Sequence, residues 1–244
     1  MLIRNRRGLN SFFIMHTRLQ KELEELKEML HSMSDLVEEA IAKAINALFN
    51  KDKELAQEVI KLDDEIDRYE VEIERKCIRI IALYHPEASD LRLVMGAYKV
   101  VSDYERIGDE AENIAHRVLE LIKEGYKITP VQLKYMAETV KDMVDMATAA
   151  FFDGDVELAK KVIEKDNTVD ELYHSVEREL ITYVLEDPKE YLHEIFPLLF
   201  IARHLERMGD HAENIAEFTF YTSEGELIRH HPILKKEEEG EEKE

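Results

Sequence analysis

An internal repeat limits this chain to a tandem architecture more strongly than any other feature of the sequence. Residues 105–115 read ERIGDEAENIA and residues 206–216 read ERMGDHAENIA, with nine identities in eleven positions. The match extends upstream, where LAQEVIKLDDEID from Leu55 aligns with LAKKVIEKDNTVD from Leu158. Because a long repeat of this kind is one structural unit copied in tandem, we expect two domains with the same fold.

Apolar spacing predicts that each copy consists of three long helices. The 244 residues include only 8 glycines and 5 prolines, too few for the frequent turns of a strand-rich fold. Apolar residues recur at steps of three and four, the period of a helix with one buried face. The predicted helices cover residues 17–50, 53–83, 88–124, 130–152, 155–186 and 189–222. The predicted fold class is all-α, with two tandem antiparallel three-helix bundles.

Breaks in the helical pattern divide the chain into four parts. EGYKITP at 124–130 interrupts the pattern between the two copies. We therefore expect a first bundle at 17–126 and a second bundle at 127–223. Residues 1–16 are expected to be a basic extension, with initiation at Met15 as an alternative, and residues 224–244 an acidic, disordered tail.

The composition excludes several classes of protein. The 54 acidic and 33 basic residues give a net charge of −21, which opposes binding to nucleic acid. The longest apolar run, 195–202, is far shorter than the ~20 residues of a membrane span. A single cysteine and the lack of any phosphate loop or nucleophile motif exclude disulfides, zinc fingers and familiar enzyme classes. We expect a soluble cytoplasmic protein that is not an enzyme.

Pairs of acidic residues four positions apart occur on two predicted helices of each copy. A spacing of four places both side chains of a pair on one helix face. In the first copy the pairs are centred 21 residues on either side of Pro86, and in the second copy 20 residues on either side of Pro188. The two pairs of each antiparallel hairpin should therefore lie at the same height. The eight acids are Asp63, Asp67, Glu105, Asp109, Asp166, Asp170, Glu206 and Asp210.

Four carboxylates at one height repel each other and favour a bound cation. Oxygen ligands select hard ions, so Ca²⁺, Mg²⁺, Mn²⁺ or an oxygen-bridged iron cluster would fit. Additional ligands could come from Glu112, Asn113, Glu213 and Asn214. The alternative is a solvated acidic face neutralised by Arg68, Arg106 or Arg207. Gly108 and Gly209 lie within predicted helices, where they indicate close helix packing or a backbone that approaches a bound ion.

These features resemble the PhoU family, the accessory regulators of bacterial phosphate uptake. The resemblance rests on the tandem bundles, on the motifs ERIGDEAENIA and ERMGDHAENIA, and on ASDLRLVM at 88–95. It covers about residues 17–222.

The resemblance implies that each bundle binds a multinuclear metal cluster, with iron in some members, through a pair of E(D)xxxD motifs. The eight acids match these motifs. The resemblance further implies a homodimer that restrains phosphate uptake and the starvation response. It would act by contact with the ATPase subunit of the phosphate ABC transporter and with a sensor histidine kinase. These contacts would bring it to the inner membrane. The alternative function is an iron storage or oxidation protein of the helical-bundle class.

Overall fold

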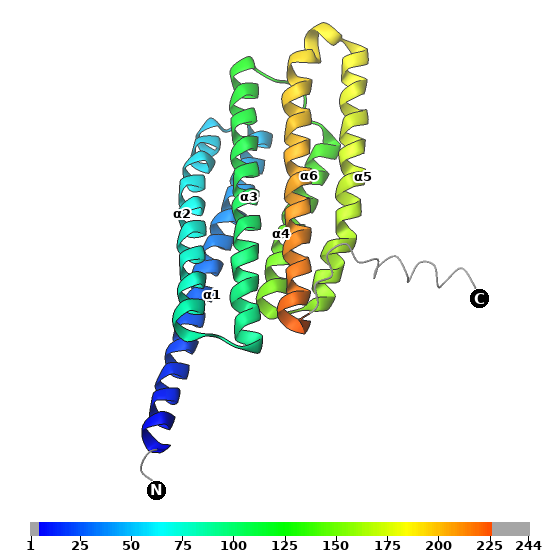
Figure 1. Ribbon diagram of the computed structural model, residues 1–244. Helices are drawn as coiled ribbons and strands as arrows, with labels where there is room; N and C mark the ends of the chain where they lie inside the picture. Colours follow the sequence, from blue (N-terminus) through cyan, green and yellow to red (C-terminus); the bar gives the residue numbers. More distant parts are fainter. Residues whose placement is uncertain (1–4, 226–244) are drawn as a thin grey trace, which may run out of the picture.

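The structure is a computed structural model that describes residues 5–225, with side chains from residue 17 onward. Six helices and no strands occur in this part of the chain, which confirms the all-α prediction (Figure 1). The helices are α1 (Asn5–Asn50), α2 (Lys53–Tyr84), α3 (Ala88–Glu124), α4 (Val131–Asp153), α5 (Val156–Glu186) and α6 (Pro188–Glu224). The predicted tail lies outside the described residues except for its first two positions.

The prediction that the first helix begins at residue 17 was wrong, because α1 begins at Asn5. Residues 5–16 contain no proline, so nothing stops a helix from extending one residue at a time beyond its packed part. The other five helices begin and end within two residues of the predicted positions.

Equivalent capping residues begin α2 and α5. Asp52 precedes α2 and its side chain accepts a hydrogen bond from the backbone N–H of Leu55 at 3.0 Å. Asp155 precedes α5 and accepts from the N–H of Leu158, also at 3.0 Å. Each cap satisfies a backbone donor that the first turn leaves free. The two copies therefore start their second helix by the same local mechanism.

The helices form two three-helix bundles that pack against each other (Figure 1). Helices α1, α2 and α3 contact one another, as do α4, α5 and α6. The bundles meet mainly through α3 and α6, with a smaller contact between α1 and α4. Helices α2 and α5 contact only helices of their own bundle and lie on the outside.

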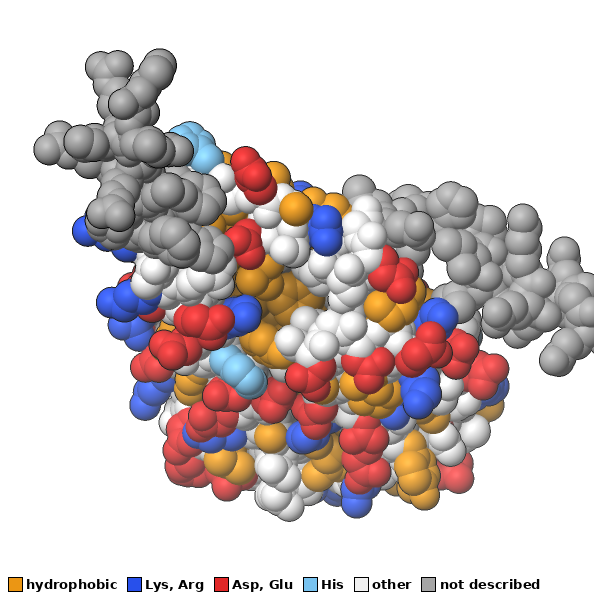
Figure 2. Space-filling model, turned by 90° about the horizontal axis from the view of Figure 1, so that it is seen from below, with side chains coloured by type: hydrophobic (Ala, Val, Ile, Leu, Met, Phe, Trp, Pro, Cys, Tyr) orange, Lys and Arg blue, Asp and Glu red, His pale blue; other side chains and the backbone are white. Residues whose placement is uncertain are grey.

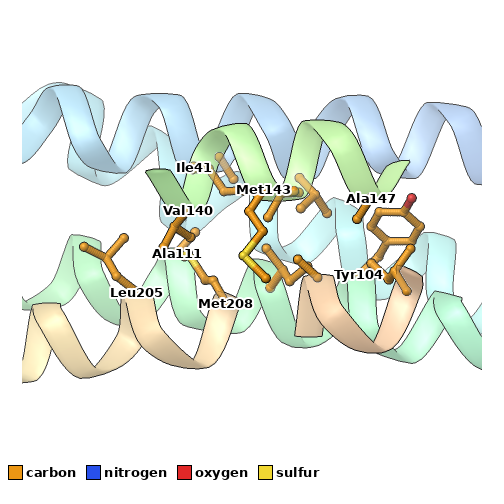
Figure 3. Packing of buried hydrophobic residues seen from close by; sticks show 14 of the residues in the cluster. Ile41, Tyr104, Ala111, Val140, Met143, Ala147, Leu205 and Met208 are labelled. Atoms are coloured by element: carbon orange, nitrogen blue, oxygen red, sulfur yellow. The ribbon is translucent and has the colours of Figure 1, made fainter. Parts of the chain in front are cut away.

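The hydrophobic core continues from one bundle into the other (Figure 3). Tyr104 of α3 is fully buried, and its hydroxyl donates a hydrogen bond to Thr148 of α4 at 3.1 Å. The close-up shows buried side chains from α1, α3, α4 and α6 gathered in one layer, among them Ile41, Tyr104, Ala111, Val140, Met143, Ala147, Leu205 and Met208. Burial of this shared layer holds the two bundles together.

The loop between the bundles is attached to α6 by a buried carboxylate. Glu194 is 1% exposed and accepts hydrogen bonds from the backbone N–H groups of Lys127 and Ile128, each at 2.8 Å. A buried charge is tolerated when it is hydrogen-bonded in this way. The connection is therefore a fixed part of the fold. None of the described helices combines the length and the apolar character needed to cross a membrane.

Candidate metal centre

The four acids of the first bundle come together in the groove between α2 and α3. We call Asp63, Asp67, Glu105 and Asp109 cluster 1. One carboxylate oxygen from each of Asp63, Asp67 and Asp109 lies within 4.8 Å of the others. The Oδ1 atom of Asp63 is buried and has no hydrogen-bond partner. The equal heights expected from the hairpin geometry are thus present in the structure, with an acceptor left unsatisfied.

Three carboxylates of cluster 1, those of Asp63, Glu105 and Asp109, have raised pKa values. Burial, followed by repulsion from Glu112, Asp67, Asp109 and Glu105, raises the pKa of Asp63 to about 7. Burial and the neighbouring Asp109 raise the pKa of Glu105 to about 7. Ionisation of both groups therefore needs a positive charge nearby, which a bound cation would supply.

The second bundle carries the four equivalent acids on α5 and α6, although among the described residues only cluster 1 brings three carboxylate oxygens within 4.8 Å of one another. We call Asp166, Asp170, Glu206 and Asp210 cluster 2. Burial, together with the other three carboxylates, raises the pKa of Asp166 to about 6. Asp166 and Glu206 are half-buried and Asp170 is exposed, the same pattern that Asp63, Glu105 and Asp67 show in cluster 1. The fourth position differs, because Asp109 is half-buried and Asp210 is exposed. The duplication has therefore preserved the burial of three of the four acids.

The four possible additional ligands fall into two groups. The charge of Glu112 raises the pKa of Asp63. Burial and the charge of Asp166 raise the pKa of Glu213 to about 7. Both carboxylates therefore border the clusters. Asn113 is exposed. Asn214 points away from cluster 2, because its side-chain amide donates to Asp103 of α3 at 3.1 Å.

One acid near cluster 1 escaped the sequence analysis. Glu70 of α2 has its pKa raised by burial and then by Glu74, Asp67 and Asp109. Its position three residues after Asp67 places it on the same helix face, a signal that could have been used. The second copy carries Tyr173 at the equivalent position, so cluster 2 has no such neighbour.

Gly108 and Gly209 allow the two helices of each hairpin to approach at the height of the acids. A Cβ atom at Gly108 would lie 3.0 and 3.1 Å from two carbons of Ile66 and 3.5 Å from Oδ1 of Asp63. A Cβ atom at Gly209 would lie 3.4 Å from Oδ1 of Asp166 and 3.4 Å from Cγ1 of Val169. Close helix packing is therefore confirmed for both glycines, and the approach of their backbone to a bound ion stays a prediction.

Alanine substitutions at the two glycines are expected to have opposite effects on stability. Gly209→Ala should raise the free energy of unfolding by up to about 1 kcal/mol, because alanine favours a helix and 3.4 Å is an ordinary contact. Gly108→Ala should lower it by about 1 kcal/mol, because Ile66 is fully buried and cannot move aside freely. Denaturant unfolding of both variants checks this, and effects of the same sign would contradict it.

The alternative of neutralisation by arginine holds only for part of the acidic face. Arg106 forms ion pairs with Asp109 at 3.1 Å and with Glu105 at 3.4 Å. Arg68 pairs with Glu65 instead, and Arg207 pairs with Glu110. None of the four acids of cluster 2 forms an ion pair within the part of the chain that the structure describes. In cluster 2 the charges of Arg203 and Arg207 offset only part of the raised pKa of Glu206, and that of Arg207 only part of the raised pKa of Asp210.

Acidity by itself does not distinguish the clusters from the rest of the surface. Figure 2 shows the end of the molecule near both chain termini, where Asp and Glu side chains cover much of the face with Lys and Arg among them. This agrees with the net charge of −21. What distinguishes the clusters is burial, the raised pKa values and the unsatisfied oxygen of Asp63.

The donor atoms of the clusters fit a hard cation. All candidate ligands are carboxylate oxygens from two helices, and no cysteine or histidine lies among them. Oxygen-only donor sets suit Mg²⁺, Ca²⁺, Mn²⁺ or iron, whereas zinc favours nitrogen and sulfur. A divalent cation in cluster 1 would join α2 to α3 and coordinate the unpaired Oδ1 of Asp63. A cation in cluster 2 would join α5 to α6.

Two three-helix bundles, each with a carboxylate cluster between its second and third helices, define a duplicated, all-helical class of protein. The model of the PhoU domain matches this chain twice, at residues 30–118 and 133–219. The chain therefore belongs to the PhoU family, which confirms the resemblance seen in the sequence.

Relatives and solved structures agree with this assignment. The chain is 57% identical to a phosphate-specific transport system accessory protein PhoU homolog of Aquifex aeolicus, over 91% of this chain and 100% of that protein. It is 37% identical to the PhoU protein of Escherichia coli over 86% of each chain. The crystal structure of PhoU from Pseudomonas aeruginosa matches with a TM-score of 0.81 and 41% identity, covering 85% of this chain and 99% of that one.

Proposed function

We propose that this protein is a metal-binding regulator of phosphate uptake and of the phosphate-starvation response, acting by protein contact and not as an enzyme. The observation that carries the proposal is the pair of carboxylate clusters at equivalent positions of a PhoU-family chain. The names of the relatives support the regulatory part, since they are accessory proteins of phosphate-specific transport, and the structure from Streptococcus pneumoniae is titled a phosphate transport system regulatory protein.

The metal part of the proposal assigns the eight acids as ligands, with Glu112 and Glu213 as additional donors. The expected cofactor is a multinuclear cluster in each bundle, with iron first and Mn, Mg or Ca as alternatives. The metal would supply positive charge that lets the buried acids ionise and would fix the spacing of the two helices. In this proposal the cation sets the shape of the outer helical surface that a partner contacts.

The partners follow from the family. We propose contact with the ATPase subunit of the phosphate ABC transporter and with the sensor histidine kinase, on the cytoplasmic side of the inner membrane, and a homodimeric state. Phosphate itself is not expected to bind the acidic surface directly, because a charge of −21 repels it.

A variant with all eight acids neutralised tests the metal and the regulatory parts together. Asp→Asn and Glu→Gln changes at the eight positions should abolish stoichiometric Fe, Mn or Mg measured by mass spectrometry on tag-free protein. In a strain that lacks the gene, this variant should fail to restore repression of starvation-response genes, whereas the wild-type gene restores it.

Each outcome separates one interpretation from the others. Repression by a metal-free variant would reject metal as part of the regulation and leave a purely structural adaptor. Unchanged phosphate uptake and gene expression after deletion would reject the regulatory function. Catalysed Fe²⁺ oxidation in an oxygen-uptake assay would favour the alternative, an iron storage or oxidation protein.

A further inference from the structure

Arg106 and Arg207 occupy equivalent positions in the repeat but contact different partners. The guanidinium of Arg106 lies inside cluster 1, with Nη1 3.1 Å from Oδ2 of Asp109 and Nε 3.4 Å from Oε2 of Glu105. The guanidinium of Arg207 is directed to the other bundle, with Nη1 2.9 Å from Oε1 of Glu110. One cluster thus contains its own countercharge, and the other has its arginine held elsewhere.

The cause is one of the two differences within the eleven-residue motif. Residue 110 is glutamate in the first copy, and its counterpart is His211 in the second. Helices α3 and α6 face each other in an antiparallel and pseudo-symmetric way, so the contact from Arg207 to Glu110 corresponds to one from Arg106 to His211. His211 has no carboxylate to offer, and its Nδ1 lies 3.0 Å from Asp103. Arg106 therefore has no partner across the interface.

The same interface explains why the two sides differ. Asp103 and Glu110 of α3 are buried and lie opposite His211 and His204 of α6, respectively. Two identical copies would place acid against acid, which is unfavourable in a buried contact. Replacing the acids of the second copy by histidines removes this conflict. As a result, Arg207 has a carboxylate partner across the interface, Glu110, and Arg106 has none there.

We propose that the two clusters bind divalent cations with unequal affinity and that Arg106 sets the difference. This inference rests on the proposed function, because it requires that the clusters bind metal. In cluster 1 an incoming cation must displace or tolerate the guanidinium of Arg106, which is half-exposed. In cluster 2 the guanidinium of Arg207 is paired with Glu110, so its charge acts on Glu206 and Asp210 without a direct ion pair. Cluster 2 therefore fills first.

Arg106 by itself is expected to lower the affinity of cluster 1 about tenfold. A guanidinium about 6 Å from a divalent ion at the protein surface contributes a repulsion that corresponds to roughly one factor of ten in affinity. Three of the four acid positions match in burial between the clusters, but Asp109 is half-buried and its counterpart Asp210 is exposed. Two other differences work against the effect of Arg106. Glu70 adds negative charge near cluster 1, and Arg203, whose counterpart is Ser102, adds positive charge near Glu206 of cluster 2.

Titration of the metal-free full chain with Mn²⁺ tests the inference by calorimetry and by the electron spin resonance of free Mn²⁺. The wild type should show two classes of site, with cluster 1 weaker than cluster 2 by at most about tenfold. Asp63→Asn with Asp67→Asn should remove the weaker class, and Asp166→Asn with Asp170→Asn the tighter one. Arg106→Gln should tighten the weaker class about tenfold. Arg207→Gln is the matched control and should leave both affinities within about threefold.

A second variant supplies Arg106 with the partner that it lacks. The exchange of Asp103→His with His211→Glu keeps an acid–histidine pair across the interface and places a carboxylate where Arg106 can reach it. Cluster 1 should then bind Mn²⁺ more tightly although Arg106 is intact. Far-ultraviolet circular dichroism checks that this variant folds, and Arg106→Gln decides the question if it does not.

The possible failures are distinguishable. Two classes of equal affinity in the wild type, or no change in Arg106→Gln, would overturn this inference and leave metal binding in place. Loss of the tighter class of Mn²⁺ site in the variant with Asp63→Asn and Asp67→Asn would also overturn it. No Mn²⁺ binding to the wild type would overturn both this inference and the metal part of the proposed function.

Discussion

Replacing Glu110 with alanine is expected to lower the free energy of unfolding by about 3–5 kcal/mol. The side chain of Glu110 is 3% exposed and accepts from both His204, at 2.5 Å, and Arg207, at 2.9 Å. Its loss leaves a buried imidazole and a guanidinium without their partner in the interface between the bundles. Thermal or denaturant unfolding measures the effect, which should amount to about 10 °C in melting temperature for a chain of this size.

Glu120→Ala is the matched control for this prediction. Glu120 also lies on α3 and pairs with an arginine, Arg117, at 2.9 Å, but both side chains are about half-exposed. Exposed pairs contribute at most about 1 kcal/mol, because water screens them. Equal losses in the two variants would show that the buried contacts of Glu110 do not hold the bundles together.

The metal-free protein is expected to lose about 3 kcal/mol of stability as the pH rises from 5 to 8. In the folded chain the pKa values of Asp63 and Glu105 are raised to about 7 and that of Asp166 to about 6, whereas in the unfolded chain they return to about 4. Between these values the folded state binds more protons than the unfolded state, so the free energy of unfolding falls with rising pH. The magnitude is reduced from the full shifts because the groups are partly solvated.

The variant with eight neutralised acids provides the control for the pH dependence. In a chelator it should be more stable than the wild type at pH 8, and its stability should fall less than that of the wild type between pH 5 and pH 8, since Glu213 is still present with a pKa raised by burial. Mn²⁺ added to the wild type at pH 8 should restore stability, because a ligand that binds only the folded state stabilises it. A wild type that is equally stable at both pH values would contradict the raised pKa values.

Much of the fold could be predicted because its information is local. The helix from 88 to 124 was predicted at both ends, since Pro86 and Gly125 interrupt the helical pattern on either side. The start of α1 was missed, because nothing in residues 5–16 marks a boundary. Periodicity shows where a helix is able to form, but not how far it extends beyond its packed part.

The geometry of the candidate site could be predicted in part, but its electrostatics could not. Equal distances from Pro86 bring the acid pairs of the first hairpin together, because carboxylate oxygens of Asp63, Asp67 and Asp109 lie within 4.8 Å of one another. Metal binding by the eight acids stays a prediction. The partners of Arg106 and Arg207 were out of reach, because they depend on how one bundle faces the other. The same holds for Asn214, which the sequence placed beside the acids and the structure places against Asp103.

The sequence alone therefore determined the helices, the duplication and the family, and it predicted the eight acids as ligands, because each depends on spacing along one helix or one hairpin. The tertiary structure decided which charges are paired. Glu110, His204 and Arg207 meet only where α3 and α6 pack, and that contact joins residues about a hundred positions apart. Repeats with nearly identical motifs thus acquire different electrostatic environments, since a change from glutamate to histidine acts through the residue that it faces in space.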